Sequence, residues 1–222
     1  MTETPVQVQR AAPATSRLAL AGPLFVAFVV VSALTRLGLA AFNADTSLFE
    51  PLRLGPAVLL GLGYDVAVAL WWCLPLVLLG WWWPAARARS ALGIVALVLT
   101  AALIGGLVFV SVAEFVFWNE FASRFNFIAV DYLVYTNEVI GNIRESYPMP
   151  LLLSVVAVAS VLLWALMLLS TRTALAAPPP NWRGRLARST VWLLLPLASY
   201  AVLNEQFKEF SDDAQANELA GN

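Results

Sequence analysis

The sequence contains no histidine and only one cysteine, Cys73. Histidine is the commonest general base and metal ligand, so its absence argues against a histidine-based catalytic triad or a self-contained metalloenzyme in this chain. A single cysteine cannot form an intrachain disulfide, and it therefore gives no information on the redox compartment. We expect no catalytic residue, no metal site and no cofactor within these 222 residues.

Charged residues are also scarce. They make up 12% of the chain, whereas a typical soluble domain has about 25%. Hydrophobic residues account for 60%. This composition excludes an ordinary soluble domain and predicts a membrane protein in contact with membrane lipids. The formal net charge is −1, and no nucleic-acid partner is expected.

Long apolar runs hold most of the hydrophobic residues. A transmembrane helix needs about 20 predominantly apolar residues, and four runs meet this comfortably: Leu18–Phe42, Pro56–Gly80, Ala91–Phe117 and Leu151–Ser170. A fifth run, Ser189–Asn204, is shorter and contains Pro196, and we expect it to span as well. The first run exceeds the core of a signal peptide, which is about 7–15 residues long, so it is read as an uncleaved anchor.

Arginine placement predicts the orientation of these spans, because cytoplasmic loops carry an excess of Lys and Arg. With the N-terminus inside, the inner segments hold eight of the 13 basic residues: Arg10, Arg17, Arg87, Arg89, Arg172, Arg183, Arg185 and Arg188. Those segments hold a single acidic residue, Glu3, and most of the acidic residues fall outside. The sequence therefore predicts an all-α polytopic protein with five transmembrane helices, a cytoplasmic tail (1–17), a transmembrane domain (18–207) and an extracytoplasmic linker (208–222).

Two ionisable residues lie within the predicted spans. Arg36 is six residues from the outer end of the first span and Asp65 nine residues from the outer end of the second, at depths of roughly 9 and 14 Å. A charge in hydrocarbon costs about 2.5–3.5 kcal/mol by insertion scales, so pairing is expected. The pair either forms a polar pocket for a lipid headgroup or is an interhelical staple, which is an ion pair that joins two helices and binds no ligand. Glu114, near the outer end of the third span, is a candidate third member.

The outer loop between the third and fourth spans, Arg124–Pro148, has helical periodicity. On a helix, one stripe is polar and the opposite arc is largely apolar, and Pro148 ends the helix. The stripe is acidic, whereas helices that bind membrane surfaces are rich in Lys and Arg. It is either the solvated face of an interfacial helix or a docking platform for an external domain. The candidate residues are Arg124, Asp131, Tyr135, Glu138, Asn142, Arg144 and Glu145.

Three stretches carry a resemblance to a known family. "RFNFIAVDYLVYTNEVIGNIRESYP" (124–148) resembles the extracytoplasmic loop of the lipoteichoic acid synthase-like family, which includes phosphoglycerol transferases of the alkaline phosphatase/sulfatase superfamily. "GLGYDVAVALWWCLPL" (61–76) is similar to the family's second span, with Asp65 in its Gly-x-x-Tyr/Phe-Asp pattern, and "TRLGL" (35–39) fits the first span. The resemblance covers most of the chain from about Leu18 onward.

The resemblance implies five spans in the bacterial cytoplasmic (inner) membrane and an external catalytic domain that these residues do not include. That domain would hold the catalytic threonine and a divalent metal, Mn or Mg, and this chain alone is expected to be inactive. The chain would then serve as a membrane anchor and lipid-presenting module. The alternative is a stand-alone polytopic scaffold or a transporter subunit.

Overall fold

The described part of the chain is entirely helical. The computed structural model describes residues 17–42, 51–82, 91–121, 136–176 and 181–220, and no strand occurs among them. The elements are η1 (Arg17–Leu20), α1 (Ala21–Phe42), α2 (Pro51–Trp82), α3 (Ala91–Phe121), α5 (Thr136–Ser146), α6 (Met149–Ala176) and α7 (Trp182–Ala220).

Four of these helices are long and apolar enough to cross a membrane, which identifies a multi-pass membrane protein. Their spanning segments are Ala21–Ala41, Gly61–Gly80, Gly93–Phe121 and Met149–Arg172. They correspond to the first four predicted spans, although the helices extend beyond the apolar runs. The fifth predicted span lies within α7 but is not among the four. Its apolar run of 16 residues is shorter than the usual length of about 20.

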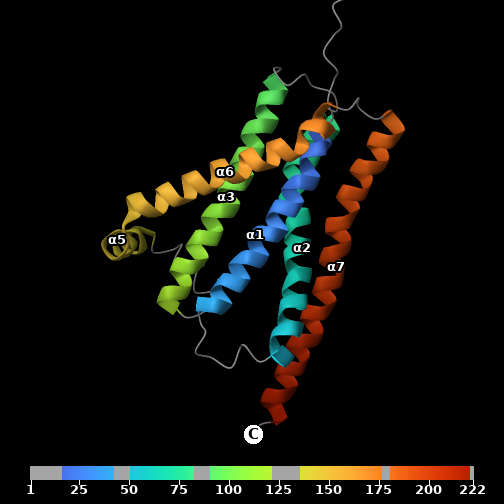
Figure 1. Ribbon diagram of the computed structural model, residues 1–222. Helices are drawn as coiled ribbons and strands as arrows, with labels where there is room; N and C mark the ends of the chain where they lie inside the picture. The colour runs from blue at the N-terminus through green and yellow to red at the C-terminus, as the bar shows by residue number, and fades with distance from the viewer. Residues whose placement is uncertain (1–16, 43–50, 83–90, 122–135, 177–180, 221–222) are drawn as a thin grey trace, which may run out of the picture.

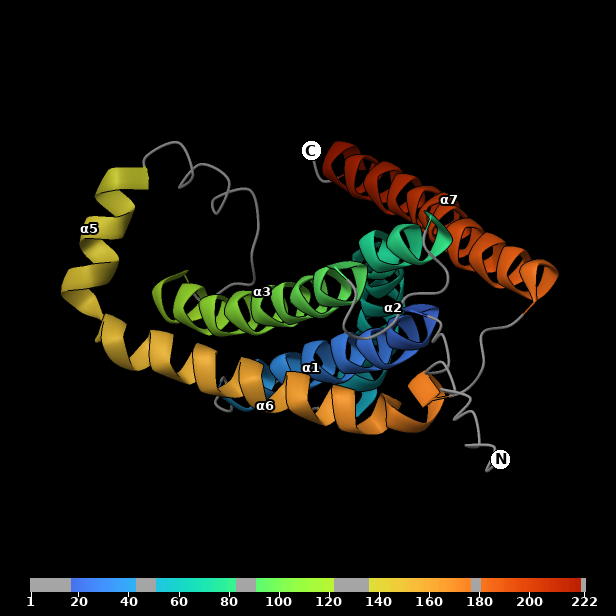
Figure 2. The ribbon, with the colours of Figure 1, turned by 90° about the horizontal axis from the view of Figure 1, so that it is seen from above.

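The long helices form a bundle in which α2 runs antiparallel to α1 and α7, α6 runs antiparallel to α3, and α1 and α3 run in the same direction (Figure 1). Helix α2 packs between α1 and α7, while α6 packs against α3. Viewed from above, α6 and α7 lie on opposite sides of the α1–α2 pair (Figure 2). We call the end where α1 and α3 finish and α2 begins the α5 end, because α5 joins the helices there.

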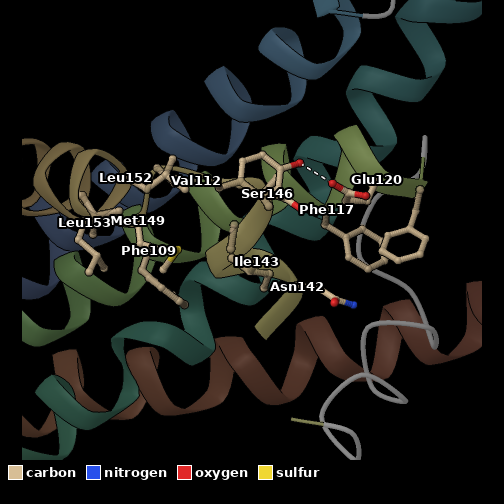
Figure 3. Close-up of a pocket in the computed structure, with 15 residues that line it drawn as sticks. Phe109, Val112, Phe117, Glu120, Asn142, Ile143, Ser146, Met149, Leu152 and Leu153 are labelled. Carbon is tan, nitrogen blue, oxygen red and sulfur yellow. Dashed lines mark hydrogen bonds between the residues drawn. The ribbon is translucent and has the colours of Figure 1, made fainter. Parts of the chain in front are cut away.

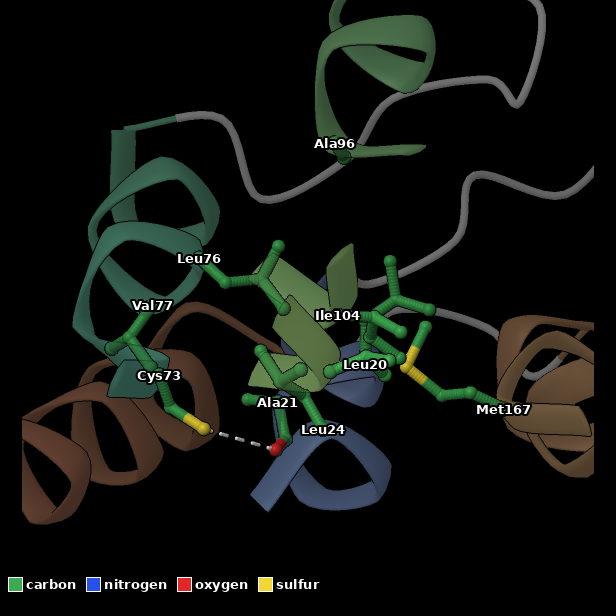
Figure 4. Packing of buried hydrophobic residues seen from close by; sticks show 10 residues of the cluster. Leu20, Ala21, Leu24, Cys73, Leu76, Val77, Ala96, Ile104 and Met167 are labelled. Atoms are coloured by element: carbon green, nitrogen blue, oxygen red, sulfur yellow. Dashed lines mark hydrogen bonds between the residues drawn. The ribbon is translucent and has the colours of Figure 1, made fainter. Parts of the chain in front are cut away.

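The core lies toward the opposite end of the bundle, where η1, α1, α2, α3 and α6 meet (Figure 4). Leu76, Ile104 and Leu24 are fully buried there. Two polar groups in the core donate to a neighbouring helix, which satisfies them within the apolar interior. The Cys73 thiol donates to the Ala21 carbonyl at 3.6 Å, and the Trp164 indole donates to Thr100 Oγ1 at 3.3 Å. These contacts fix the relative positions of α1, α2, α3 and α6.

Helix α7 differs from its sequence prediction at both ends. It begins at Trp182 and continues to Ala220, so residues 208–220, expected to be a linker, have helical backbone. This segment contains Lys, Glu, Gln, Ala and Leu, which are strong helix formers, and it contains no proline or glycine. Pro196 lies inside the helix and is fully buried. Neighbouring helices and hydroxyl side chains make proline tolerable within a membrane helix, and Ser199 Oγ donates to the Pro196 carbonyl at 2.8 Å.

Helix α6 presents an apolar surface along much of its length. Leu151, Val158, Val161, Leu162 and Leu166 are each more than half exposed. A patch of this size on a soluble protein would mark an interaction site, whereas on a spanning helix it is the surface that contacts lipid. Helix α6 is therefore the most lipid-exposed of the four spans.

Packing at Leu76 should be essential and packing at Leu78 should not, although both lie on α2. Leu76 is fully buried and Leu78 is 44% exposed. We expect Leu76→Ala to lower the free energy of unfolding in detergent by about 2–3 kcal/mol, because it leaves a cavity, and Leu78→Ala to lower it by less than about 0.5 kcal/mol. Reversible unfolding in mixed micelles measures both. Equal losses would contradict the described packing.

Candidate functional site

Arg36 and Asp65 form an ion pair between α1 and α2. Arg36 Nη2 lies 2.8 Å from both Oδ1 and Oδ2 of Asp65, and it also donates to the Gly61 carbonyl at 3.0 Å. The two side chains are 19% and 11% exposed. Both residues sit within the spanning segments, where an unpaired charge is costly. The contact therefore neutralises each charge and joins the two helices.

Gly61 makes this contact possible. The guanidinium lies directly against the α2 backbone, and a Cβ atom at position 61 would overlap Arg36 Nη1 and Cζ. Gly61 and Asp65 are one helical turn apart, so they face the same neighbour. The glycine provides the space and a carbonyl acceptor, and the aspartate provides the countercharge.

The structure also shows how far the polar network extends. Arg36 Nε and Nη1 have no hydrogen-bond partner within the described ranges. Glu114 on α3 is buried, at 7% exposure. Its membership of the Arg36–Asp65 network stays a prediction, as does the binding of a lipid headgroup there. The observed geometry is that of an ion pair that joins α1 to α2 through Arg36 Nη2.

A second feature is a cavity of about 340 Å³ between α3, α5 and α6 at the α5 end (Figure 3). This volume lies within the usual range for small-ligand sites, about 300–1,000 Å³. Leu152, Leu153 and Phe109 gather at one end, and Glu120 and Asn142 lie toward the other. The lining residues are Phe109, Val112, Ala113, Val116, Phe117, Glu120, Phe121, Asn142, Ile143, Ser146, Tyr147, Met149, Leu152, Leu153 and Val156. We call this space the α3–α6 cavity.

Tyr147 lies between α5 and α6 and connects them to the end of α3 through two hydrogen bonds. Its hydroxyl donates to Glu120 Oε1 at 2.7 Å and accepts from Asn119 Nδ2 at 2.9 Å. Burial, together with the hydrogen bond to Glu120, raises the pKa of Tyr147 above its ordinary value of 10.0. The phenol therefore keeps its proton at neutral pH and remains a donor. These bonds hold α5 beside the polar end of the α3–α6 cavity.

The structure tests the predicted outer helix only in part. Helix α5 ends at Ser146, just before Pro148, as the proline predicts. Asn142, Arg144 and Glu145 have exposed side chains, and Asn142 also lines the cavity. Glu138 belongs to α5, but its side chain lies outside the described set, and so do Arg124, Asp131 and Tyr135 in full.

The α3–α6 cavity was not predicted from the sequence. Its walls come from α3, α5 and α6. The apolar residues of a span do not indicate from the sequence which neighbouring helix they face. Tyr147 directly before Pro148 at the start of a span, and the pair Asn119–Glu120 at the end of another, are the signals that could have suggested a polar corner.

The α3–α6 cavity combines an apolar lining with a polar end, a shape and chemistry that suit an amphiphile. In the described ranges, no three Cys, Asp or Glu side chains come together as a metal site. Comparison with protein-family models, with curated proteins and with solved structures finds no match.

Gly61 and Gly63 provide a matched test of the staple. Gly61→Ala should displace the Arg36 guanidinium and destabilise the protein by about 1–3 kcal/mol, as expected when a buried hydrogen-bonding group loses its partner. Gly63 has nothing within 4 Å of a built Cβ, so Gly63→Ala should be neutral or stabilising by up to about 1 kcal/mol. Thermal unfolding in detergent measures the difference, and equal midpoints would exclude the staple as a source of stability.

Proposed function

We propose that this chain is the membrane anchor and lipid-presenting module of a phosphoglycerol transferase-like enzyme of the sulfatase superfamily. Its catalytic domain would lie outside these 222 residues, on the outer side of a bacterial cytoplasmic membrane. The resemblance of residues 124–148 to the family's outer loop supports this proposal. The single observation that carries it is the placement of α5, which is held at the bundle end with polar side chains exposed.

Five spans with an external C-terminus form part of the proposal. Helix α7 packs along α2, and its apolar section takes part in the bundle: Ser189 and Pro196 are buried, and Trp192 packs edge-on against Phe25 with ring centroids 6.1 Å apart. At 39 residues, α7 is about 58 Å long, well beyond a hydrocarbon core of about 30 Å. Helices of this length and packing support a fifth crossing despite the short apolar run.

With this topology, the α5 end faces outward. The exposed Asn142, Arg144 and Glu145 then meet water or the surface of an external domain. A single membrane-bound lipid held beside α5 would lie next to the active site of a domain docked there. Positioning of this kind can contribute several kcal/mol to a reaction between two bound molecules. The enzyme would transfer a phosphoglycerol-type group or hydrolyse a phosphate or sulfate ester outside the membrane.

A reporter fused after Asn222 tests the topology. An alkaline phosphatase fusion, which is active only outside the cytoplasm, should be active, and a β-galactosidase fusion at the same residue should be inactive. The reason is the excess of arginine on the opposite side of the spans. An active β-galactosidase fusion with a silent phosphatase would place the C-terminus inside and remove the basis for an external partner.

A photocrosslinking residue at position 145 tests the docking surface in cells. Glu145 is exposed on α5, and Val161 is exposed on the lipid-facing surface of α6. We expect p-benzoylphenylalanine at position 145 to capture a sulfatase-like domain, identified by mass spectrometry, and the same residue at position 161 to capture lipid. Capture of a polytopic membrane protein at position 145 would instead favour the scaffold or transporter-subunit function.

A further inference from the structure

We propose that the α3–α6 cavity binds one phospholipid whose headgroup carries a positively charged primary amine, as in phosphatidylethanolamine. One acyl chain would occupy the apolar part, and the ammonium group would lie beside Glu120. The biological reason for binding this lipid rests on the proposed lipid-presenting function. The binding itself is argued from the cavity.

The walls of the cavity lie in the membrane. Its α3 residues fall within the spanning segment Gly93–Phe121 and its α6 residues within Met149–Arg172. A volume of about 340 Å³ is at the small end of ligand sites, so it accommodates one chain rather than a whole lipid. Phe109 and Leu153 line the cavity and are each more than half exposed on the bundle surface. A chain can therefore enter sideways from the surrounding lipid.

Aromatic rings and a carboxylate gather at the α5 end of the cavity. Phe117 and Phe121 lie with ring centroids 4.5 Å apart, on either side of Glu120 in the sequence, and Tyr147 bonds to that carboxylate. Aromatic faces attract ammonium groups through their quadrupoles, and a carboxylate attracts them through its charge. Together they form a cation-accepting end on an otherwise apolar cavity.

The hydrogen-bonding groups favour a primary amine. The Tyr147 hydroxyl already donates to Glu120 Oε1, so the second carboxylate oxygen and the Asn142 side chain are the acceptors nearest the cavity end. A primary ammonium offers three donors, whereas a quaternary amine offers none. An anionic headgroup without an amine would be repelled by Glu120. No basic side chain lines the cavity among the residues that the structure describes.

A second apolar space supports this assignment by contrast. It lies between α1, α6 and α7 and is larger, about 840 Å³, and its only polar side chains are those of Ser170 and Trp192. No charged residue lines it within the described ranges. It can hold lipid chains, but it has no means of selecting a headgroup. Headgroup selection is therefore expected at the α3–α6 cavity.

Photolabelling with matched lipids tests the inference. The purified chain is placed in phosphatidylglycerol nanodiscs with a trace of phosphatidylethanolamine or phosphatidylglycerol, each carrying the same diazirine-bearing acyl chain. We expect the ethanolamine probe to label peptides containing residues 109–121 and 149–156 about five-fold more than the glycerol probe, a ratio that corresponds to about 1 kcal/mol. Equal labelling of these peptides by the two probes would overturn the proposal.

Three variants test whether the cavity is the binding site. Leu153 and Leu162 are 53% and 59% exposed on the same helix, but only Leu153 lines the cavity. Leu153→Trp should reduce labelling by the ethanolamine probe about five-fold because it fills the space, and Leu162→Trp should leave it unchanged. Glu120→Gln should remove the preference between the probes. Labelling that is insensitive to Leu153→Trp would contradict the proposal. If a variant does not fold, the comparison of the two probes on the unmodified chain still tests the proposal.

These results are separable from the proposed function. Selective labelling of the cavity together with capture of no sulfatase-like domain at position 145 would refute the enzyme-module function and leave the lipid site standing. Capture of such a domain without selective labelling would refute the lipid site alone.

Discussion

The arrangement of the bundle depends on the ion pair between Arg36 and Asp65. A lone charge at either position would be held in hydrocarbon at a cost of several kcal/mol, so the two helices must meet where the charges meet. Gly61 lets the guanidinium lie against the α2 backbone, which sets the distance between α1 and α2. Helix α7 packs against α2, and α3 packs against α1. The Arg36–Asp65 contact therefore sets the position of α1 along α2, and the other helices pack against this pair.

The two ends of the bundle have different chemistry. The core around Leu76 and Ile104 is apolar and closely packed, and Cys73 and Trp164 form hydrogen bonds to neighbouring helices there. At the α5 end, Tyr147 ties the start of α6 to the end of α3, and a cavity remains below α5. Close packing at one end and a polar, partly open corner at the other are the features from which the lipid site is proposed.

The sequence predicted the helices and the charged pair, because both follow from local rules. Apolar runs define spans, and two opposite charges at comparable depth on adjacent spans must pair. It did not predict the end of α7, where strong helix formers extend the helix through residues expected to be a linker. Nor did it predict the α3–α6 cavity. Val112 and Leu152 look alike in the sequence whether they face lipid or each other, and only the crossing of α3 and α6 brings them together.

We propose that the α5 end of the bundle holds a single lipid between α3, α5 and α6. Electron cryomicroscopy of the protein in nanodiscs made from bacterial phospholipids tests it most directly. We expect one elongated density in the α3–α6 cavity, running from Leu152 toward Glu120, with its polar end beside Tyr147. A cavity closed by movement of α5 onto α3, with no lipid density between them, would contradict it.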